Sequence, residues 1–154
     1  MSKKLLERKD NAQIIENIRD SYSINSSPRK PEIRGVAISL LPFQDNLCFY
    51  CCQEMKDGNI QVDHCLARKI MQNDQIWNLV PCHSECNISK GHKVVTKNFI
   101  EKLIARIEKI IKSNHIVKNE IIEQLGRTAG ERKIAVFSHY ENVKLLSDNK
   151  YWQR

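Results

Sequence analysis

The sequence lacks any long apolar run. Its longest nearly apolar stretch, residues 35–43, is much shorter than the roughly 20 residues that a membrane-spanning helix needs. The first residues, MSKKLLERKD, carry charges where a signal peptide would need an apolar segment. We therefore expect a cytoplasmic protein with no membrane partner.

Cysteine is absent from both flanks of the chain. All six cysteines fall between Cys48 and Cys86. Disulfide scaffolds are rare in the cytoplasm, so this clustering favours metal ligation over disulfide bonds. The sequence also has no internal repeat and no low-complexity tract.

Acidic residues are fewer than basic ones. Lys and Arg total 25 against 18 Asp and Glu, which gives a net charge of +7 and a pI of about 9.2. This balance favours polyanionic partners such as nucleic acids, because each phosphate contact releases counterions. A solvated basic surface without such a partner has the same composition, so charge alone leaves both interpretations open.

The N-terminal part is expected to be helical. A chain of 154 residues holds one modest domain, or a small core with appended helices. Apolar spacing predicts a helix over residues 1–24, followed by a basic linker at residues 25–31. Pro31 suits the first turn of a short helix, where its missing N–H breaks no hydrogen bond. That helix would bury one apolar stripe: Ile33, Val36, Ala37, Leu40 and Leu41.

A small hairpin is expected in the middle of the chain. Residues 59–64 alternate apolar and polar side chains as a strand does, and residues 77–82 form a second strand. The loop between them contains Arg68, Lys69 and Asp74. Such a hairpin buries few apolar residues, so it needs another source of stability.

The C-terminal part has strong helical spacing. Asn98 and Glu101 resemble a capping pair, and apolar residues then repeat at i, i+3, i+4 and i+7 up to residue 111. Two more helices are expected over residues 116–125 and 131–146. The apolar stripe is either core packing or a seam for a partner, so these helices could bind a second copy of the chain or a larger protein.

The cysteine spacing predicts a zinc site. Cys48 and Cys51 form one half-site, and Cys86 pairs with either Cys82 or His83 in the other. Both pairings give four soft or borderline ligands, which favours zinc over calcium or magnesium. Four protein ligands leave no open position for water, so the ion would be structural.

Asp63 and His64 are suited to phosphodiester hydrolysis. Histidine has a reference pKa near neutrality and can deprotonate water, while a carboxylate is a hard ligand for Mg²⁺. Taken alone, a histidine at a strand end is more often a structural group. In a regular strand the two side chains would also point to opposite faces.

The segments CFYC, VDH, WNLV and CNISKG, in that order, resemble the HNH endonucleases of the ββα-metal nuclease superfamily. This resemblance implies an α+β fold, with a small zinc-stabilised ββα-metal core flanked by N- and C-terminal helices. It places an N-terminal helix and basic linker at residues 1–30, the nuclease domain at 31–113 and a C-terminal helical extension at 114–154.

The resemblance also implies residue roles. His64 matches the general base, Asp63 and Asn87 match the ligands of a catalytic Mg²⁺ or Mn²⁺, and Asn78 matches the residue that holds the base-bearing loop. The position of the family's third zinc ligand favours the set Cys48, Cys51, His83 and Cys86, with Cys82 as the alternative. Nucleic-acid contacts are expected from Lys90, Arg68 and Lys69. Two positions depart from the family pattern, Cys52 where glycine is frequent and Ala67 where proline is common.

The leading hypothesis is a metal-dependent endonuclease that cuts DNA, with RNA as an open alternative, in a setting such as restriction or phage defence. The competing hypothesis is a zinc-stabilised nucleic-acid-binding module that has lost catalysis. A third is a helical interaction protein in which residues 99–146 are the functional part.

Overall fold

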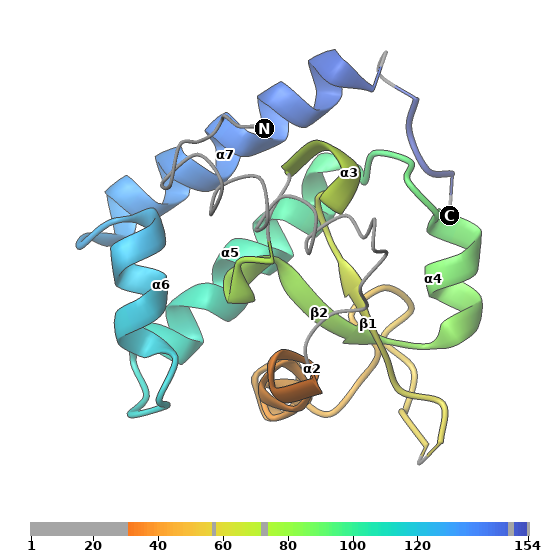
Figure 1. The fold of residues 1–154 in the computed structure, drawn as a ribbon, viewed down its shortest axis with the longest axis horizontal. Coiled ribbons are helices and arrows are strands. Elements are labelled where there is room, and N and C mark those ends of the chain that lie inside the picture. The colour runs from red at the N-terminus through yellow and green to blue at the C-terminus, as the bar shows by residue number, and fades with distance from the viewer. Residues whose placement is uncertain (1–30, 57, 72–73, 148–149, 154) are drawn as a thin grey trace, which may run out of the picture.

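The computed structural model describes residues 31–56, 58–71, 74–147 and 150–153. The helix expected over residues 1–24, and the linker before Pro31, lie outside these residues. The described elements are α2 (Pro31–Ile38), 3-10 helix η1 (Leu41–Gln44), β1 (Gln61–His64), α3 (Arg68–Met71), 3-10 helix η2 (Ile76–Asn78), β2 (Leu79–Cys82), α4 (Ser84–Lys90), α5 (Lys97–Ile111), α6 (Lys118–Leu125) and α7 (Ala129–Leu146). The fold is α+β, as expected, with one small two-stranded sheet among helices (Figure 1).

The hairpin joins two strands of four residues each. β1 and β2 are antiparallel, and His64 pairs with Leu79 while Gln61 pairs with Cys82. All four residues of β2 are buried. A two-stranded sheet is marginal by itself, so this burial against helices supports it.

The segment between the strands contains helical turns where a loop was expected. α3 and η2 lie there, and β2 begins at Leu79 and not at Trp77. The Asn78 N–H donates to the Gln75 carbonyl at 2.9 Å, which closes the 3-10 turn and delays the strand. The strand expected from residue 77 was therefore placed two residues too early.

α5 forms the centre of the core. The predicted apolar stripe is fully buried at Ile100, Leu103, Ile107 and Ile110 and partly buried at its other positions, and α5 contacts η1, η2, α6 and α7. The expected cap was wrong, because Thr96 occupies the N-cap position and Asn98 lies inside the helix. Of the described helices, none has both the length and the apolar character that a membrane span requires.

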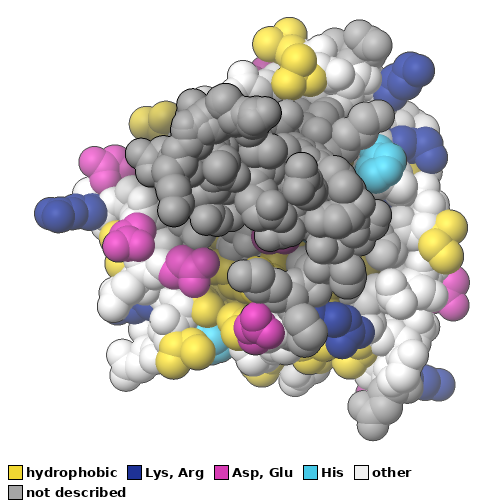
Figure 2. All heavy atoms as spheres, viewed as in Figure 1, with side chains coloured by type: hydrophobic (Ala, Val, Ile, Leu, Met, Phe, Trp, Pro, Cys, Tyr) yellow, Lys and Arg dark blue, Asp and Glu magenta, His cyan; other side chains and the backbone are white. Residues whose placement is uncertain are grey.

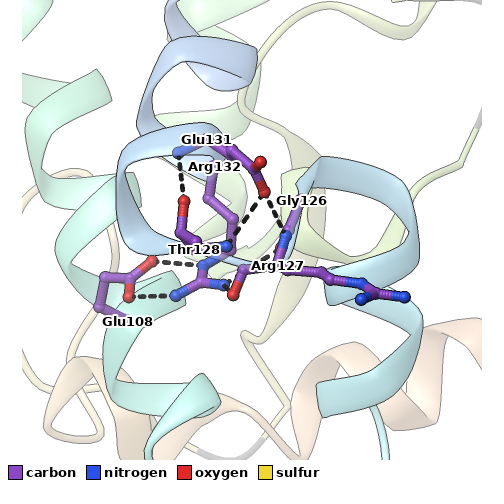
Figure 3. Close-up of polar contacts among 6 residues, drawn as sticks. All are labelled: Glu108, Gly126, Arg127, Thr128, Glu131 and Arg132. Carbon is purple, nitrogen blue, oxygen red and sulfur yellow. Dashed lines mark hydrogen bonds and ion pairs between the residues drawn. The ribbon is translucent and has the colours of Figure 1, made fainter.

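A polar cluster fixes the corner between α6 and α7 (Figure 3). Thr128 and Glu131 form a capping box at the start of α7. Arg132 binds both carboxylate oxygens of Glu108 on α5, at 2.7 and 2.8 Å. Gly126 has φ of 136°, and a Cβ atom there would lie 2.6 Å from the Glu131 Cβ, so this turn requires glycine. α5, α6 and α7 are thereby joined into one packed unit.

The chain after α7 returns to the hairpin side of the molecule and ends beside α4 (Figure 1). Val94 pairs with Tyr151 in a parallel bridge. Trp152 is buried, stacks on Phe99 at 5.7 Å and meets the Tyr50 ring edge-on at 5.2 Å. The C-terminal segment therefore packs against the residues that carry the Cys48–Cys51 turn.

Candidate functional site

Four potential metal ligands meet where the hairpin joins α4. Cys48 Sγ lies 3.8 Å from Cys86 Sγ, and Cys51 Sγ lies 3.2 Å from His83 Nδ1. Ligand atoms on a tetrahedral zinc ion, with Zn–S bonds of about 2.3 Å, lie about 3.8 Å apart. The ligand atoms of the cluster all lie within 4.8 Å of one another: Cys48, Cys51, His83 and Cys86. The described cysteines are free thiols, so the spacing fits a metal and not a disulfide.

The surroundings of the cluster favour metal-binding protonation states. The outer nitrogen of His83, Nε2, lies 3.0 Å from the Glu54 carbonyl, which favours the tautomer with its lone pair on Nδ1, toward the cysteines. Burial raises the pKa of the Cys48 thiol, but backbone N–H donors, including that of His83, outweigh it and lower the pKa to about 7. A thiolate is the form that binds metal.

Cys82 and Cys52 lie outside the cluster. Cys82 is fully buried at the end of β2, and burial raises the pKa of its thiol well above the ordinary value. It packs as a neutral core residue, so the geometry favours His83 over Cys82 as the third ligand. Cys52 is exposed and has φ of 60°, the left-handed region that favours glycine. This conformation accounts for the glycine that is frequent at that place.

His64 ends β1 and is paired with a carboxylate that the sequence analysis left without a role. Its Nε2 lies 2.7 Å from Asp74 Oδ1. Arg68 Nε contacts the same oxygen at 3.1 Å. Asp74 thus holds both the histidine and an arginine that was expected to contact nucleic acid. Lys69, the third such residue, also lies on α3.

The Asp63 side chain is bound by two residues other than Asp74, the partner of the His64 ring. Its Oδ2 accepts from the Tyr50 hydroxyl at 2.5 Å and from Lys90 Nζ at 3.0 Å. The Asp63 carboxylate therefore contacts Tyr50 and Lys90 while the His64 ring contacts Asp74, as side chains on opposite faces of a strand predict.

The burial of Lys90 argues against the phosphate contact that was expected of it. Its side chain has no solvent exposure, and Nζ also donates to the His64 carbonyl at 3.0 Å. An ammonium group without exposure needs several oxygen partners, which Asp63 and the His64 carbonyl supply. Lys90 is therefore a buried partner of Asp63 and not a surface cation.

Asn78 clamps the chain that follows His64. Its side chain accepts from the Leu66 N–H and donates to the Leu66 carbonyl, both at 2.8 Å. The Cys65 N–H donates to the Asn78 carbonyl at 2.9 Å. These three hydrogen bonds fix the two residues after the histidine.

Arg106 braces this clamp from α5. It is almost fully buried, and its guanidinium donates to the carbonyls of Trp77 at 3.1 Å and Leu79 at 2.9 Å, the two neighbours of Asn78. Burial lowers the pKa of this guanidinium to about 10. Sequence reasoning missed Arg106, because its position beside an apolar stripe looks like that of any surface cation.

Asn87 lies on α4, one helical turn before Lys90. It is half-buried, and its side chain makes no hydrogen bond among the described residues. Residues three apart share a helix face, so Asn87 lies on the same face as the lysine that binds Asp63. Its amide is thus available for a ligand.

Residues 48–96 match the model of a family described as HNH endonuclease. The resemblance to HNH endonucleases is confirmed over this segment. The HNH segment (residues 48–96) contains the cysteine cluster, the hairpin and α4. Arg106 and α5 to α7 lie outside it.

One solved structure that is similar to this chain is that of the Type II-C Cas9 enzyme from Actinomyces naeslundii, with 17% identity and a TM-score of 0.43. The match covers 82% of this chain and 13% of that chain. Among curated proteins, none matches this chain.

Proposed function

We propose that the chain is a metal-dependent HNH endonuclease that hydrolyses phosphodiester bonds in DNA. The observation that carries this proposal is the His64–Asp74 contact at 2.7 Å inside the HNH segment. A histidine oriented by a carboxylate is the arrangement that general-base catalysis uses.

His64 accepts the proton of the attacking water. The contact to Asp74 keeps the proton of the neutral ring on Nε2 and leaves the basic lone pair on Nδ1. The water oxygen attacks phosphorus, its proton moves to Nδ1, and the P–O bond to the leaving oxygen breaks. Asp74 stabilises the imidazolium that results, and Asn78 holds the loop that fixes the histidine.

Asp63 and Asn87 would hold the divalent ion. They offer a carboxylate and an amide oxygen, which are the hard donors that Mg²⁺ and Mn²⁺ prefer. Asp63 Oδ2 is bound by Tyr50 and Lys90, while Oδ1 has no hydrogen bond among the described residues. A bound ion would stabilise charge on the phosphate and on the leaving oxygen. Because Lys90 already offsets the charge of Asp63, we expect weak ion binding until substrate phosphate adds its own charge.

The cysteine cluster would hold a structural zinc ion. Cys48, Cys51, His83 and Cys86 supply all four positions of a tetrahedron, and no position remains for water. Its role would be to fasten the short hairpin to α4 and to the turn that carries Tyr50.

The same contacts favour a second candidate, a nucleic-acid-binding module without catalysis. The ion pair between Asp63 and a fully buried lysine could itself replace a catalytic metal. In that case the site would bind the phosphate backbone but would not cut it.

Incubation with supercoiled plasmid and Mg²⁺ or Mn²⁺ separates the two candidates. We expect nicked or linear product from the wild-type chain, and a loss of at least about 100-fold in His64→Ala, the scale of a general-base contribution. The matched control is His115→Ala, because this histidine contacts Ser39 far along the chain from the site. Equal cleavage by His64→Ala and the wild type would remove the general-base assignment, and absence of metal-dependent cleavage in both would favour the binding module.

A further inference from the structure

A basic pocket lies between the end of α4 and the end of α7. This lysine pocket has a volume of about 380 Å³ and is lined by Lys90, His92, Lys93, Ser147 and Lys150, among others. None of the described residues that line it is acidic. Lys90 contacts Asp63 and the His64 carbonyl, so the lysine pocket borders the candidate active site.

A second pocket lies along the start of α5 and the side of α7. This aromatic pocket has a volume of about 600 Å³ and is lined by Lys97, Lys133, Phe137, Tyr140 and Tyr151, among others. Lys97 Nζ lies 6.0 Å from the centroid of the Phe137 ring. Glu101 and Glu141 also line it, and Glu141 is paired with Lys144 at 2.9 Å. The pocket therefore combines aromatic rings with a small excess of positive charge.

The two pockets lie on either side of one short segment. Lys150 lines the lysine pocket, and its neighbour Tyr151 lines the aromatic pocket. Val94 binds this segment by hydrogen bonds to the Lys150 carbonyl at 2.9 Å and from the Trp152 N–H at 2.8 Å. A ligand that occupies both pockets would therefore cross this segment.

The lysines that line these pockets, apart from Lys90 and Lys144, have no carboxylate partner among the described residues, although Lys93 Nζ donates to the Ser89 carbonyl at 3.2 Å. In the described part of the chain, Lys93, Lys97, Lys133 and Lys150 form no ion pair. The buried cations Lys90, Arg106 and Arg132 each bind two or more protein oxygens. In Figure 2, Lys or Arg side chains lie beside a histidine at the upper right, toward the end of α7 in Figure 1.

We propose that the two pockets form one binding path for an unpaired nucleic-acid strand that leaves the active site. Lys93 and Lys150 would contact phosphates, and Tyr151 and Phe137 would stack on bases. Single-strand grooves combine a positively charged track with aromatic rings in this way, and rings are not needed to bind a duplex backbone. Phe137 is half-buried and Tyr151 is 36% exposed, so neither side chain is fully covered by the fold. The inference rests on the proposed nuclease function and adds the form of the substrate.

The test is binding of a fluorescent oligothymidylate, and of its duplex with oligoadenylate, to the full chain carrying His64→Ala. We expect tighter binding of the single strand. Lys93→Gln with Lys150→Gln should reduce the slope of log affinity against log salt by about 1.4, which is about 0.7 for each lost contact on a single strand. Tyr151→Ala should weaken binding about tenfold, and Tyr151→Phe should restore it.

The matched control is the pair Lys56→Gln and Lys112→Gln. Both lysines are exposed, neither lines either pocket, and the pair removes the same charge. Equal losses in the two double variants would overturn the proposal, because general charge would then account for binding. Tighter binding of the duplex, together with no effect of Tyr151→Ala, would also overturn it.

Hydrolysis of bis(p-nitrophenyl) phosphate distinguishes this proposal from the nuclease function. That substrate has no strand beyond the reacting phosphate, so the lysine double variant should hydrolyse it at the wild-type rate. If His64→Ala and the wild type hydrolyse this substrate at the same rate, the proposed nuclease function is wrong. The oligonucleotide-binding result then still tests the proposed strand-binding path. If their hydrolysis rates differ but the pocket variants bind the single strand as tightly as the parent chain, the proposed binding path is wrong and the nuclease function is retained.

Discussion

A lysine side chain with no solvent exposure needs partners for its charge. Lys90 has the Asp63 carboxylate at 3.0 Å, the His64 carbonyl at 3.0 Å and the Gly91 carbonyl at 3.4 Å around its Nζ. It therefore joins both residues of the Asp-His pair to α4. The Tyr50 hydroxyl completes the surroundings of Asp63, and burial, followed by the charge of Asp63, raises the pKa of that phenol well above its ordinary value.

Lys90→Met should destabilise the chain by about 3 kcal/mol, because it leaves a part-buried carboxylate without its cation. Adding Asp63→Asn to Lys90→Met should recover part of this loss, since the amide carries no charge that needs a partner. Urea unfolding of the wild type, both single variants and the double variant measures the coupling. Lys93→Met is the control, since Lys93 is exposed. Strictly additive losses would contradict a coupled ion pair.

At the scale of elements, α7 contacts η2, the 3-10 helix that holds the loop after His64. His139 on α7 stacks on Trp77 of η2 at 5.5 Å, with an interplanar angle of 29°. Trp77 precedes Asn78, which clamps Leu66. Burial lowers the pKa of His139 below its ordinary value of 6.5, so the folded chain favours the neutral ring.

This stacking predicts a pH dependence of stability. Near pH 6 the unfolded chain binds more protons at residue 139 than the folded chain, so the free energy of unfolding falls as pH drops below 6.5. In His139→Phe, which keeps an aromatic ring and cannot titrate, this fall should be smaller. Urea midpoints of both chains on either side of that pH measure the difference. The same fall in both would show that other groups cause the acid sensitivity.

At the scale of the whole molecule, the cysteine cluster joins parts that are far apart in sequence. It connects the Cys48–Cys51 turn to α4, while Lys102 on α5 binds the Phe49 carbonyl within that turn. The hairpin between these parts has only four residues in each strand. Stability of the HNH segment should therefore depend on the ion.

We expect one zinc ion per purified chain. Removal of the ion by a chelator should lower the free energy of unfolding by several kcal/mol, because the binding energy of a structural zinc ion contributes to folding. Cys48→Ser should lose the ion as well. Cys52→Ser is the matched control, because Cys52 is exposed and outside the cluster. Elemental analysis and thermal unfolding check both statements, and full zinc content in Cys48→Ser would contradict the ligand set.

Sequence reasoning succeeded where a local pattern determines the structure. The start of the helix at Pro31, the α5 stripe and the last two helices follow from helical spacing, and the hairpin follows from alternation and its flanking cysteines. The helix that begins at Pro31 ends at Ile38, however, before Leu40 and Leu41, which were expected to belong to its stripe. It failed at η2 and at the α5 cap, because a 3-10 turn and an N-cap each depend on one or two hydrogen bonds that neighbouring residues could equally form.

The sequence by itself placed the resemblance to HNH endonucleases in residues 48–96 and identified Cys48, Cys51 and Cys86 as candidate ligands, because fixed spacing along the chain is what a metal-binding turn requires. The structure then favoured His83 over Cys82 as the fourth member of the cluster.

Only the tertiary structure showed that His64 meets Asp74, that Lys90 is buried against Asp63, and that Arg106 braces the carbonyls around Asn78. Those pairings join residues 10 to 29 positions apart, and their partners are selected by packing and by the need of buried charges for oxygen atoms. No local pattern in the sequence records that need.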